Sequence, residues 1–203
     1  MHANPAATLV YLHGFRSSPA SAKARQLVAA VEALPPAARP VLHVPALSGG
    51  PARDVADTLA WIEANVAQPQ GQLTLVGSSL GGFYATHIAE HVGSRAVLVN
   101  PAIRPYDDLR PYLGPQVNLY TGETFAVTEA HFDELRALAV DRVTHPERYW
   151  LMVQTGDEVL DYREAVAFYA GAYQFVEGGG DHGFQRFEAQ IAPLLRFAGV
   201  EVR

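Results

Sequence analysis

The chain has 203 residues, 49% of them hydrophobic and 18% charged, which suits one globular domain and excludes a disordered tail. The formal net charge of −6, with scattered basic residues, makes nucleic acid an unexpected partner, and the lack of cysteine excludes disulfides, thiolate zinc sites and a cysteine nucleophile. No apolar run approaches the roughly 18 residues of a membrane span, and no signal peptide is visible at the N-terminus. We therefore expect a cytoplasmic protein with no membrane partner; the sequence leaves its oligomeric state open.

Short apolar runs alternate with helical patterns along the chain. The runs are nearly all unbroken, which is typical of strands buried on both faces of a sheet. They are Thr8–His13, Val41–Val44, Leu73–Val76, Ala96–Asn100, Trp150–Thr155 and Gln174–Glu177. Helical patterns lie at about 20–34, 54–66, 80–92, 161–170 and 185–197. This alternation predicts a single α/β domain over residues 1–203, with about six mostly parallel strands in the order 2-1-3-4-5-6 and helices on both faces.

A long segment interrupts the alternation. Residues 101–149 contain several prolines, a helical pattern near Thr128–Val140 and no convincing strand. Segments of this length are usually lids or binding elements, so we expect a short helical lid. The aromatic residues of the segment would line a pocket in a lid, but they would equally form the core of a small packed subdomain; they are Tyr106, Tyr112, Tyr120, Phe125 and Phe132.

The strongest chemical motif is Gly77-Ser-Ser79-Leu-Gly81, a G-x-S-x-G between an apolar strand and a helix. A nucleophilic serine at such a turn is strained, and only glycines two positions away avoid collision with it. The alternative is a glycine-bearing helix start with serine as N-cap. The strand and helix on either side favour Ser79 as a nucleophile.

A serine nucleophile needs a base, and the base needs an orienting carboxylate. Asp157 and His182 follow the fifth and sixth predicted strands, at the sheet edge where open α/β sheets bind ligands. Glu158, Asp161 and Asp181 are rival acids. Because Asp161 fits a helix cap and Asp181 is adjacent to the histidine, we expect Asp157 to be the acid.

Acyl transfer also requires donors for the developing oxyanion. We expect these to be the backbone N–H groups of Phe15, after the first strand, and Leu80, after the nucleophile. His13 is interpreted as structural, because His182 already supplies a base. The glycine-rich loop 178–183 fits a dinucleotide motif formally but lacks a following strand, and no residue pattern has metal-ligand spacing. We expect neither metal nor organic cofactor.

Several motifs resemble the YqiA/YcfP-like family of small bacterial α/β-hydrolase esterases. The similar segments are 12–19, 76–84, 100–102, 120–122 and 154–163, together with the loop 177–182. The resemblance implies an esterase or thioesterase with Ser79 as nucleophile, His182 as base and Asp157 as acid, and no cofactor. Gly183, directly after the base, departs from the family pattern, and we expect it to loosen the position of His182.

We therefore expect a serine hydrolase that cleaves small acyl esters or thioesters through a Ser-His-Asp triad and an acyl-enzyme. An acyltransferase or carbon–carbon hydrolase would use the same residues. A catalytically silent binding protein on the same scaffold is the alternative from another class.

Overall fold

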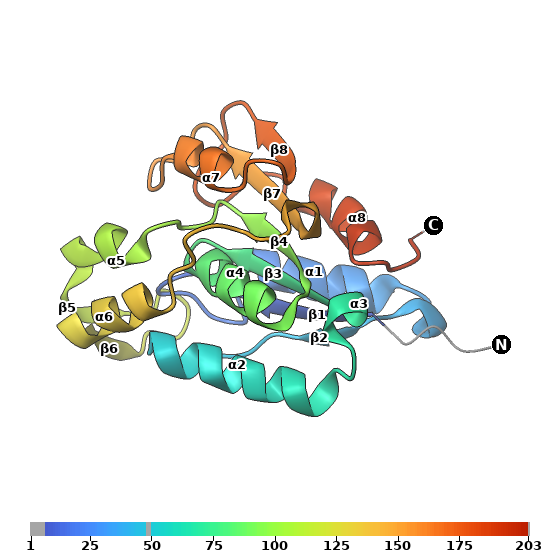
Figure 1. The fold of residues 1–203 in the computed structure, drawn as a ribbon, viewed down its shortest axis with the longest axis horizontal. Coiled ribbons are helices and arrows are strands. Elements are labelled where there is room, and N and C mark those ends of the chain that lie inside the picture. The colour runs from blue at the N-terminus through green and yellow to red at the C-terminus, as the bar shows by residue number, and fades with distance from the viewer. Residues whose placement is uncertain (1–6, 48–49, 203) are drawn as a thin grey trace.

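The sheet has six strands, all paired in parallel, in the order β2-β1-β3-β4-β7-β8. A computed structural model describes residues 7–47 and 50–202 (Figure 1). The strands are β1 (Thr8–Leu12), β2 (Val41–His43), β3 (Leu73–Ser78), β4 (Arg95–Val99), β7 (Tyr149–Gln154) and β8 (Tyr173–Glu177). Both the six predicted strands and their order are confirmed. The order reverses between β1 and β3, so a crevice opens beyond the carboxyl ends of these two strands.

Five main helices correspond to the five helical patterns of the sequence. They are α1 (Ala22–Ala33), α2 (Pro51–Asn65), α4 (Leu80–Val92), α7 (Tyr162–Phe168) and α8 (Glu188–Phe197). The other helices are α3 (Pro69–Gln72), α5 (Pro105–Asp108) and α6 (Glu129–Ala137), with 3₁₀ turns at Pro36–Ala38, Arg110–Tyr112 and Pro146–Arg148.

Alternate residues of each central strand face opposite layers of helices. In β1, Leu9 and Tyr11 pack with α1 and α8, whereas Val10 and Leu12 pack with α2 and α4. All four side chains are buried. Burial on both faces explains why the strand reads as one unbroken apolar run.

The segment 101–149 differs from the expectation of a purely helical lid. It contains an antiparallel hairpin of β5 (Gly114–Val117) and β6 (Thr124–Val127), in addition to α5 and α6. The prediction that this segment has no strand was wrong, because each strand has only four residues and β5 alternates between half-buried and exposed positions. Such short strands give no apolar run. Figure 1 places α5, α6 and the hairpin together at one end of the molecule.

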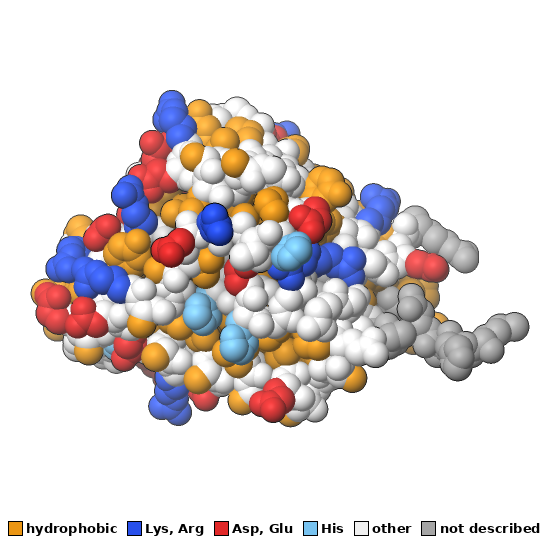
Figure 2. Space-filling view, in the orientation of Figure 1, with side chains coloured by type: hydrophobic (Ala, Val, Ile, Leu, Met, Phe, Trp, Pro, Cys, Tyr) orange, Lys and Arg blue, Asp and Glu red, His pale blue; other side chains and the backbone are white. Residues whose placement is uncertain are grey.

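Charged side chains are dispersed over the face that carries α2 and α4. Figure 2 shows basic and acidic side chains interspersed there, with no continuous basic stripe on that face. None of the helices within residues 7–47 and 50–202 is long and apolar enough to cross a membrane.

Candidate active site

Ser79 lies at a sharp turn between β3 and α4. Its φ of 55° and ψ of −121° are strained for a residue with a side chain. A Cβ on Gly81 would lie 2.0 Å from the carbonyl oxygen of Leu12, and a Cβ on Gly77 would lie 2.3 Å from the carbonyl oxygen of Gly81. Gly81 therefore allows α4 to begin this close to β1, and Gly77 allows the end of β3 to lie this close to the start of α4. The turn presents the Ser79 hydroxyl at the crevice.

The structure brings Ser79, His182 and Asp157 together from the loops after β3, β8 and β7. Nε2 of His182 lies 3.0 Å from Oγ of Ser79, and Nδ1 lies 2.9 Å from Oδ2 of Asp157. When Nδ1–H donates to the carboxylate, Nε2 accepts from the serine hydroxyl. The His182 side chain is 23% exposed and that of Asp157 is 2% exposed. This arrangement can transfer a proton from Ser79 to His182.

Asp157 is held as a carboxylate despite its burial. Burial alone would raise its pKa, but the hydrogen bond from His182 and the backbone N–H groups of Leu160 and Val159 lower it, and the net pKa lies below the usual value. The carboxylate is thus ionised at neutral pH and can accept a hydrogen bond from the imidazole of His182.

The three rival acids bond elsewhere. Glu158 accepts the backbone N–H of His182 at 3.0 Å rather than a ring nitrogen. Asp161 caps α7 by accepting the N–H of Arg163 at 3.0 Å, as the capping pattern predicts. Asp181 accepts from Nε2 of Gln185 at 2.8 Å. Of the four acids, only Asp157 contacts the imidazole.

Two polar residues that the sequence analysis did not single out hold the loop of His182. Nδ2 of Asn100 donates to the carbonyl oxygens of Asp181 and His182 at 3.0 and 3.2 Å. Oε1 of Gln154 accepts the N–H groups of Asp181 and Gln185 at 3.3 and 2.8 Å. Both side chains are buried. In the sequence, each is a polar residue at the carboxyl end of an apolar run, and this was the signal that could have identified them.

Gly183 is also fixed in place. Nζ of Lys23, on α1, donates to its carbonyl oxygen at 2.7 Å. The loop after His182 is therefore hydrogen-bonded to α1, despite the glycine.

Leu80 directly follows Ser79, and Phe15 directly follows Gly14, which packs against Ser79. Gly14 approaches Ser79 so closely that a Cβ there would lie 3.1 Å from the serine Cβ. Within the described part of the chain, the N–H groups of Phe15 and Leu80 have no backbone or side-chain acceptor. These two donors are free to bind an oxyanion.

His13 has a structural environment. It is buried, its Nδ1 lies 3.1 Å from the Gly14 carbonyl oxygen, and its Nε2 accepts the N–H of Leu47 at 3.3 Å. Burial lowers its pKa, so the ring is neutral and both nitrogens are satisfied. The interpretation of His13 as a structural residue agrees with this geometry.

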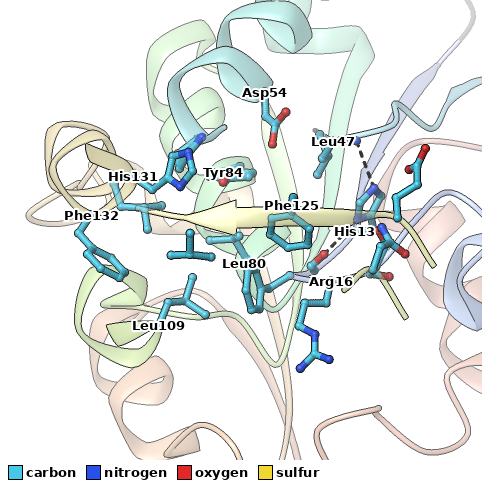
Figure 3. Close-up of a pocket in the computed structure, with 18 of the residues that line it drawn as sticks. His13, Arg16, Leu47, Asp54, Leu80, Tyr84, Leu109, Phe125, His131 and Phe132 are labelled. Carbon is cyan, nitrogen blue, oxygen red and sulfur yellow. Dashed lines mark hydrogen bonds between the residues drawn. The ribbon is translucent and has the colours of Figure 1, made fainter. Parts of the chain in front are cut away.

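A cavity of about 560 Å³, which we call the apolar pocket, opens beside Leu80 beneath the hairpin and α6. Its volume is in the range of small-molecule sites. Figure 3 shows Leu80, Leu109, Phe125 and Phe132 around the hollow, with the polar residues Asp54, Tyr84 and His131 on one side of it. Phe125 and Phe132, two of the aromatic residues of segment 101–149, line this pocket.

A second hollow, of about 370 Å³, contains Ser79 and His182 themselves; we call it the polar cleft. It also exposes Arg16, Lys23 and Tyr120. The polar cleft and the apolar pocket share the segment 14–17, so together they form two arms that meet beside Ser79.

The hairpin is hydrogen-bonded to the loop after β1. Nε of Arg16 donates to the carbonyl oxygen of Val117 at 3.0 Å, and the N–H of Leu119 donates to the carbonyl oxygen of Arg16 at 2.9 Å. Nδ2 of Asn118 donates to the carbonyl oxygen of Ser17 at 2.7 Å. The roof of the apolar pocket is thus connected to the loop that carries Phe15.

No group of three or more histidine, aspartate or glutamate residues suited to a metal ion occurs within the described residues.

The parallel sheet with its strand order, and the strained serine between β3 and α4 with histidine and aspartate after later strands, define an α/β-hydrolase fold. A family model matches residues 8–199, which is nearly the whole chain. The chain belongs to that family, UPF0227, an uncharacterised protein family that corresponds to the YqiA/YcfP resemblance of the sequence.

Solved structures with the same fold share little sequence with the chain. A candidate hydrolase from Agrobacterium vitis S4 is 20% identical, with a TM-score of 0.74 over 97% of this chain and 88% of that one. Mouse alpha/beta hydrolase domain-containing protein 10 is 16% identical, with a TM-score of 0.69 over 96% and 90%. Carboxylesterase CesB from Bacillus subtilis is 14% identical, with a TM-score of 0.61 over 96% and 84%. At these identities the likeness establishes the fold.

Proposed function

We propose that the protein is a serine hydrolase that cleaves small acyl esters or thioesters through an acyl-enzyme. The observation that supports this most strongly is the hydrogen-bonded chain from Ser79 through His182 to Asp157, with distances of 3.0 and 2.9 Å. Esterases among the proteins of similar fold are consistent with it.

The chemistry follows from this geometry. His182 removes the Ser79 proton as Oγ attacks the carbonyl carbon, and the N–H groups of Phe15 and Leu80 stabilise the tetrahedral oxyanion. The C–O or C–S bond then breaks, and His182 returns the proton to the leaving group. Water, activated by the same imidazole, releases the acyl group from Ser79.

The two arms of the site would bind different parts of the substrate. His182 must reach the leaving group to protonate it, and His182 lines the polar cleft but not the apolar pocket. The leaving group therefore occupies the polar cleft, and the acyl chain occupies the apolar pocket beside Leu80.

The test uses a fluorophosphonate probe and p-nitrophenyl butyrate. The probe labels wild-type protein and Ser78→Ala but not Ser79→Ala, and ester turnover falls at least about a thousandfold in Ser79→Ala. Labelling that persists in Ser79→Ala would refute the assignment. Equal turnover by the two proteins would favour a silent binding protein instead.

An acyltransferase is distinguished by its acceptor. Hydrolysis in water alone supports the proposed function, whereas turnover that requires an added alcohol or thiol indicates acyl transfer. A carbon–carbon hydrolase would leave the ester uncleaved while reacting with the probe.

A further inference from the structure

The polar cleft gathers positive charge beside the nucleophile of an acidic protein. Arg16 and Lys23 both line it, and none of the described residues that line it is acidic, although the chain carries a net charge of −6. We propose that the polar cleft binds an anionic group, a carboxylate or a phosphate, carried by the leaving group of the ester or thioester. This inference rests on the proposed hydrolase function.

Lys23 has capacity to bind an anion. Its ammonium carries three N–H groups, and one of them donates to the Gly183 carbonyl oxygen at 2.7 Å. Loss of solvation lowers the pKa of Lys23 to about 8, against the opposing effects of Asp181 and Asp157. Both carboxylates are already hydrogen-bonded to other groups. A bound anion would stabilise the charged form of this partly desolvated ammonium.

Arg16 supplies the second cation. Its Nε donates to the carbonyl oxygen of Val117 at 3.0 Å, and within the described residues its guanidinium has no carboxylate partner. The remaining N–H groups can form a two-pronged contact with a carboxylate or phosphate, which is the geometry that guanidinium favours.

The start of α1 lies at the same place. The helix has 12 residues, no acidic residue in its first turn and no side-chain cap from Ser21, its N-cap residue. Ser21 lines the polar cleft and is 6% exposed. Its buried Oγ lies near the Tyr11 hydroxyl but has no hydrogen-bond partner of good geometry within the described residues. Free N–H groups and a buried hydroxyl without a partner next to two cations are the features of an anion site.

The anion must be close to the scissile bond. One hollow of about 370 Å³ contains Ser79, His182 and both cations, so only a short linker fits between the reacting carbonyl and the anion. The protonating residue His182 is in this hollow, which assigns the anion to the leaving group.

The test compares esters that differ in charge at one position. 4-Butyryloxybenzoate carries a carboxylate on the leaving group, and 4-butyryloxybenzamide is its neutral analogue of similar size. Wild-type protein is expected to prefer the benzoate by about tenfold in kcat/KM, because a charge-assisted hydrogen bond is lost in the amide. 4-Butyryloxyphenyl phosphate then distinguishes a phosphate from a carboxylate preference.

The variants Arg16→Gln and Lys23→Gln are each expected to lower this benzoate-to-benzamide ratio about tenfold. The ratio is the readout because any general effect of either substitution on turnover cancels in it. Arg25→Gln removes the same charge from an exposed position on α1 outside the cleft and is expected to keep the wild-type ratio. If Lys23→Gln does not fold, the benzoate-to-benzamide ratio of Arg16→Gln decides the test.

Two results would overturn the anion site while leaving the proposed function intact. One is a wild-type ratio near one, or a ratio unchanged in both variants, with Ser79-dependent hydrolysis of the benzamide ester. The other is a preference for mono-p-nitrophenyl succinate over p-nitrophenyl butyrate that the two variants abolish, which would place the anion on the acyl side. Absence of any Ser79-dependent hydrolysis would refute both proposals.

Discussion

Asn100 holds the backbone of His182: Nδ2 donates to the His182 carbonyl oxygen at 3.2 Å and to that of Asp181 at 3.0 Å. Oδ1 of the same side chain accepts the N–H of Gln154 at 3.0 Å. One amide thus joins the ends of β4 and β7 to the loop that carries the proposed base. The position of the imidazole depends on it.

Replacing Asn100 with aspartate tests this dependence. The new carboxylate cannot donate and would repel both carbonyl oxygens, so the loop moves and kcat falls about 10- to 100-fold, with a smaller change in KM. Ester hydrolysis measures the effect, and Asn65→Asp on the surface of α2 is the control. Unchanged kcat in a folded Asn100→Asp protein would contradict the positioning role.

Asp157 and Asp161 form a matched pair of substitutions. Asp157→Asn removes the carboxylate that orients His182 and is expected to reduce turnover about 10⁴-fold with little change in fold. Asp161→Asn keeps a residue that caps helices well, so both turnover and melting temperature stay near wild type. Steady-state kinetics with circular dichroism checks both. Equal losses of turnover in the two variants would show that Asp157 is not the acid.

Lys23 makes stability depend on pH. Its pKa is about 8 in the folded protein and about 10.4 in an unfolded chain. Between these values the unfolded state binds the extra proton, so the free energy of unfolding contributed by Lys23 rises with pH. Urea unfolding of wild type and Lys23→Met should show the wild type gaining relative stability from pH 7.5 to 9.5. A constant difference would argue against a desolvated ammonium.

Gly81 should not tolerate even one added methyl group. The Cβ of Gly81→Ala would overlap the backbone of Leu12 and His13, which are part of or next to β1. We expect a loss of at least about 3 kcal/mol in the free energy of unfolding. In Gly71→Ala the Cβ meets no atom within 4 Å, so this variant should be as stable as wild type. Chemical denaturation measures both.

Tyr84 and Tyr169 are both buried but differ in hydrogen bonding. Oη of Tyr84 has no partner within the described residues, whereas Oη of Tyr169 lies 2.6 Å from Oγ1 of Thr86. Tyr84→Phe should therefore stabilise the protein by about 1 kcal/mol, and Tyr169→Phe should destabilise it by a similar amount. Changes of the same sign in urea unfolding would contradict this interpretation.

The sheet and the positions of the three candidate residues could be predicted from the sequence because their signals are local. Each buried strand is a continuous apolar run, and Ser79, Asp157 and His182 each follow one. The glycines around Ser79 mark the strained turn directly. Parallel strands then bring these separate loops to one edge of the sheet.

The supporting contacts could not be predicted because they join distant segments. Asn100 and Lys23 act on a loop that lies about 80 and 160 residues further along the chain. The hairpin was missed because four-residue strands with half-buried alternation resemble a loop. Its place above Leu80 follows only from the folded arrangement.

The three hydrogen bonds between the hairpin and residues 16–17 have a consequence for engineering of the chain. Two of them end on backbone carbonyl oxygens that flank or belong to Arg16, which directly follows Phe15. A hairpin transplanted from another protein would reshape the apolar pocket. Unless it supplied the same two donors and one acceptor, it would also leave the backbone next to Phe15 without these hydrogen bonds, and the Phe15 N–H would lose its fixed position. Swaps of this roof should therefore retain Asn118 and the backbone path of Val117 to Leu119.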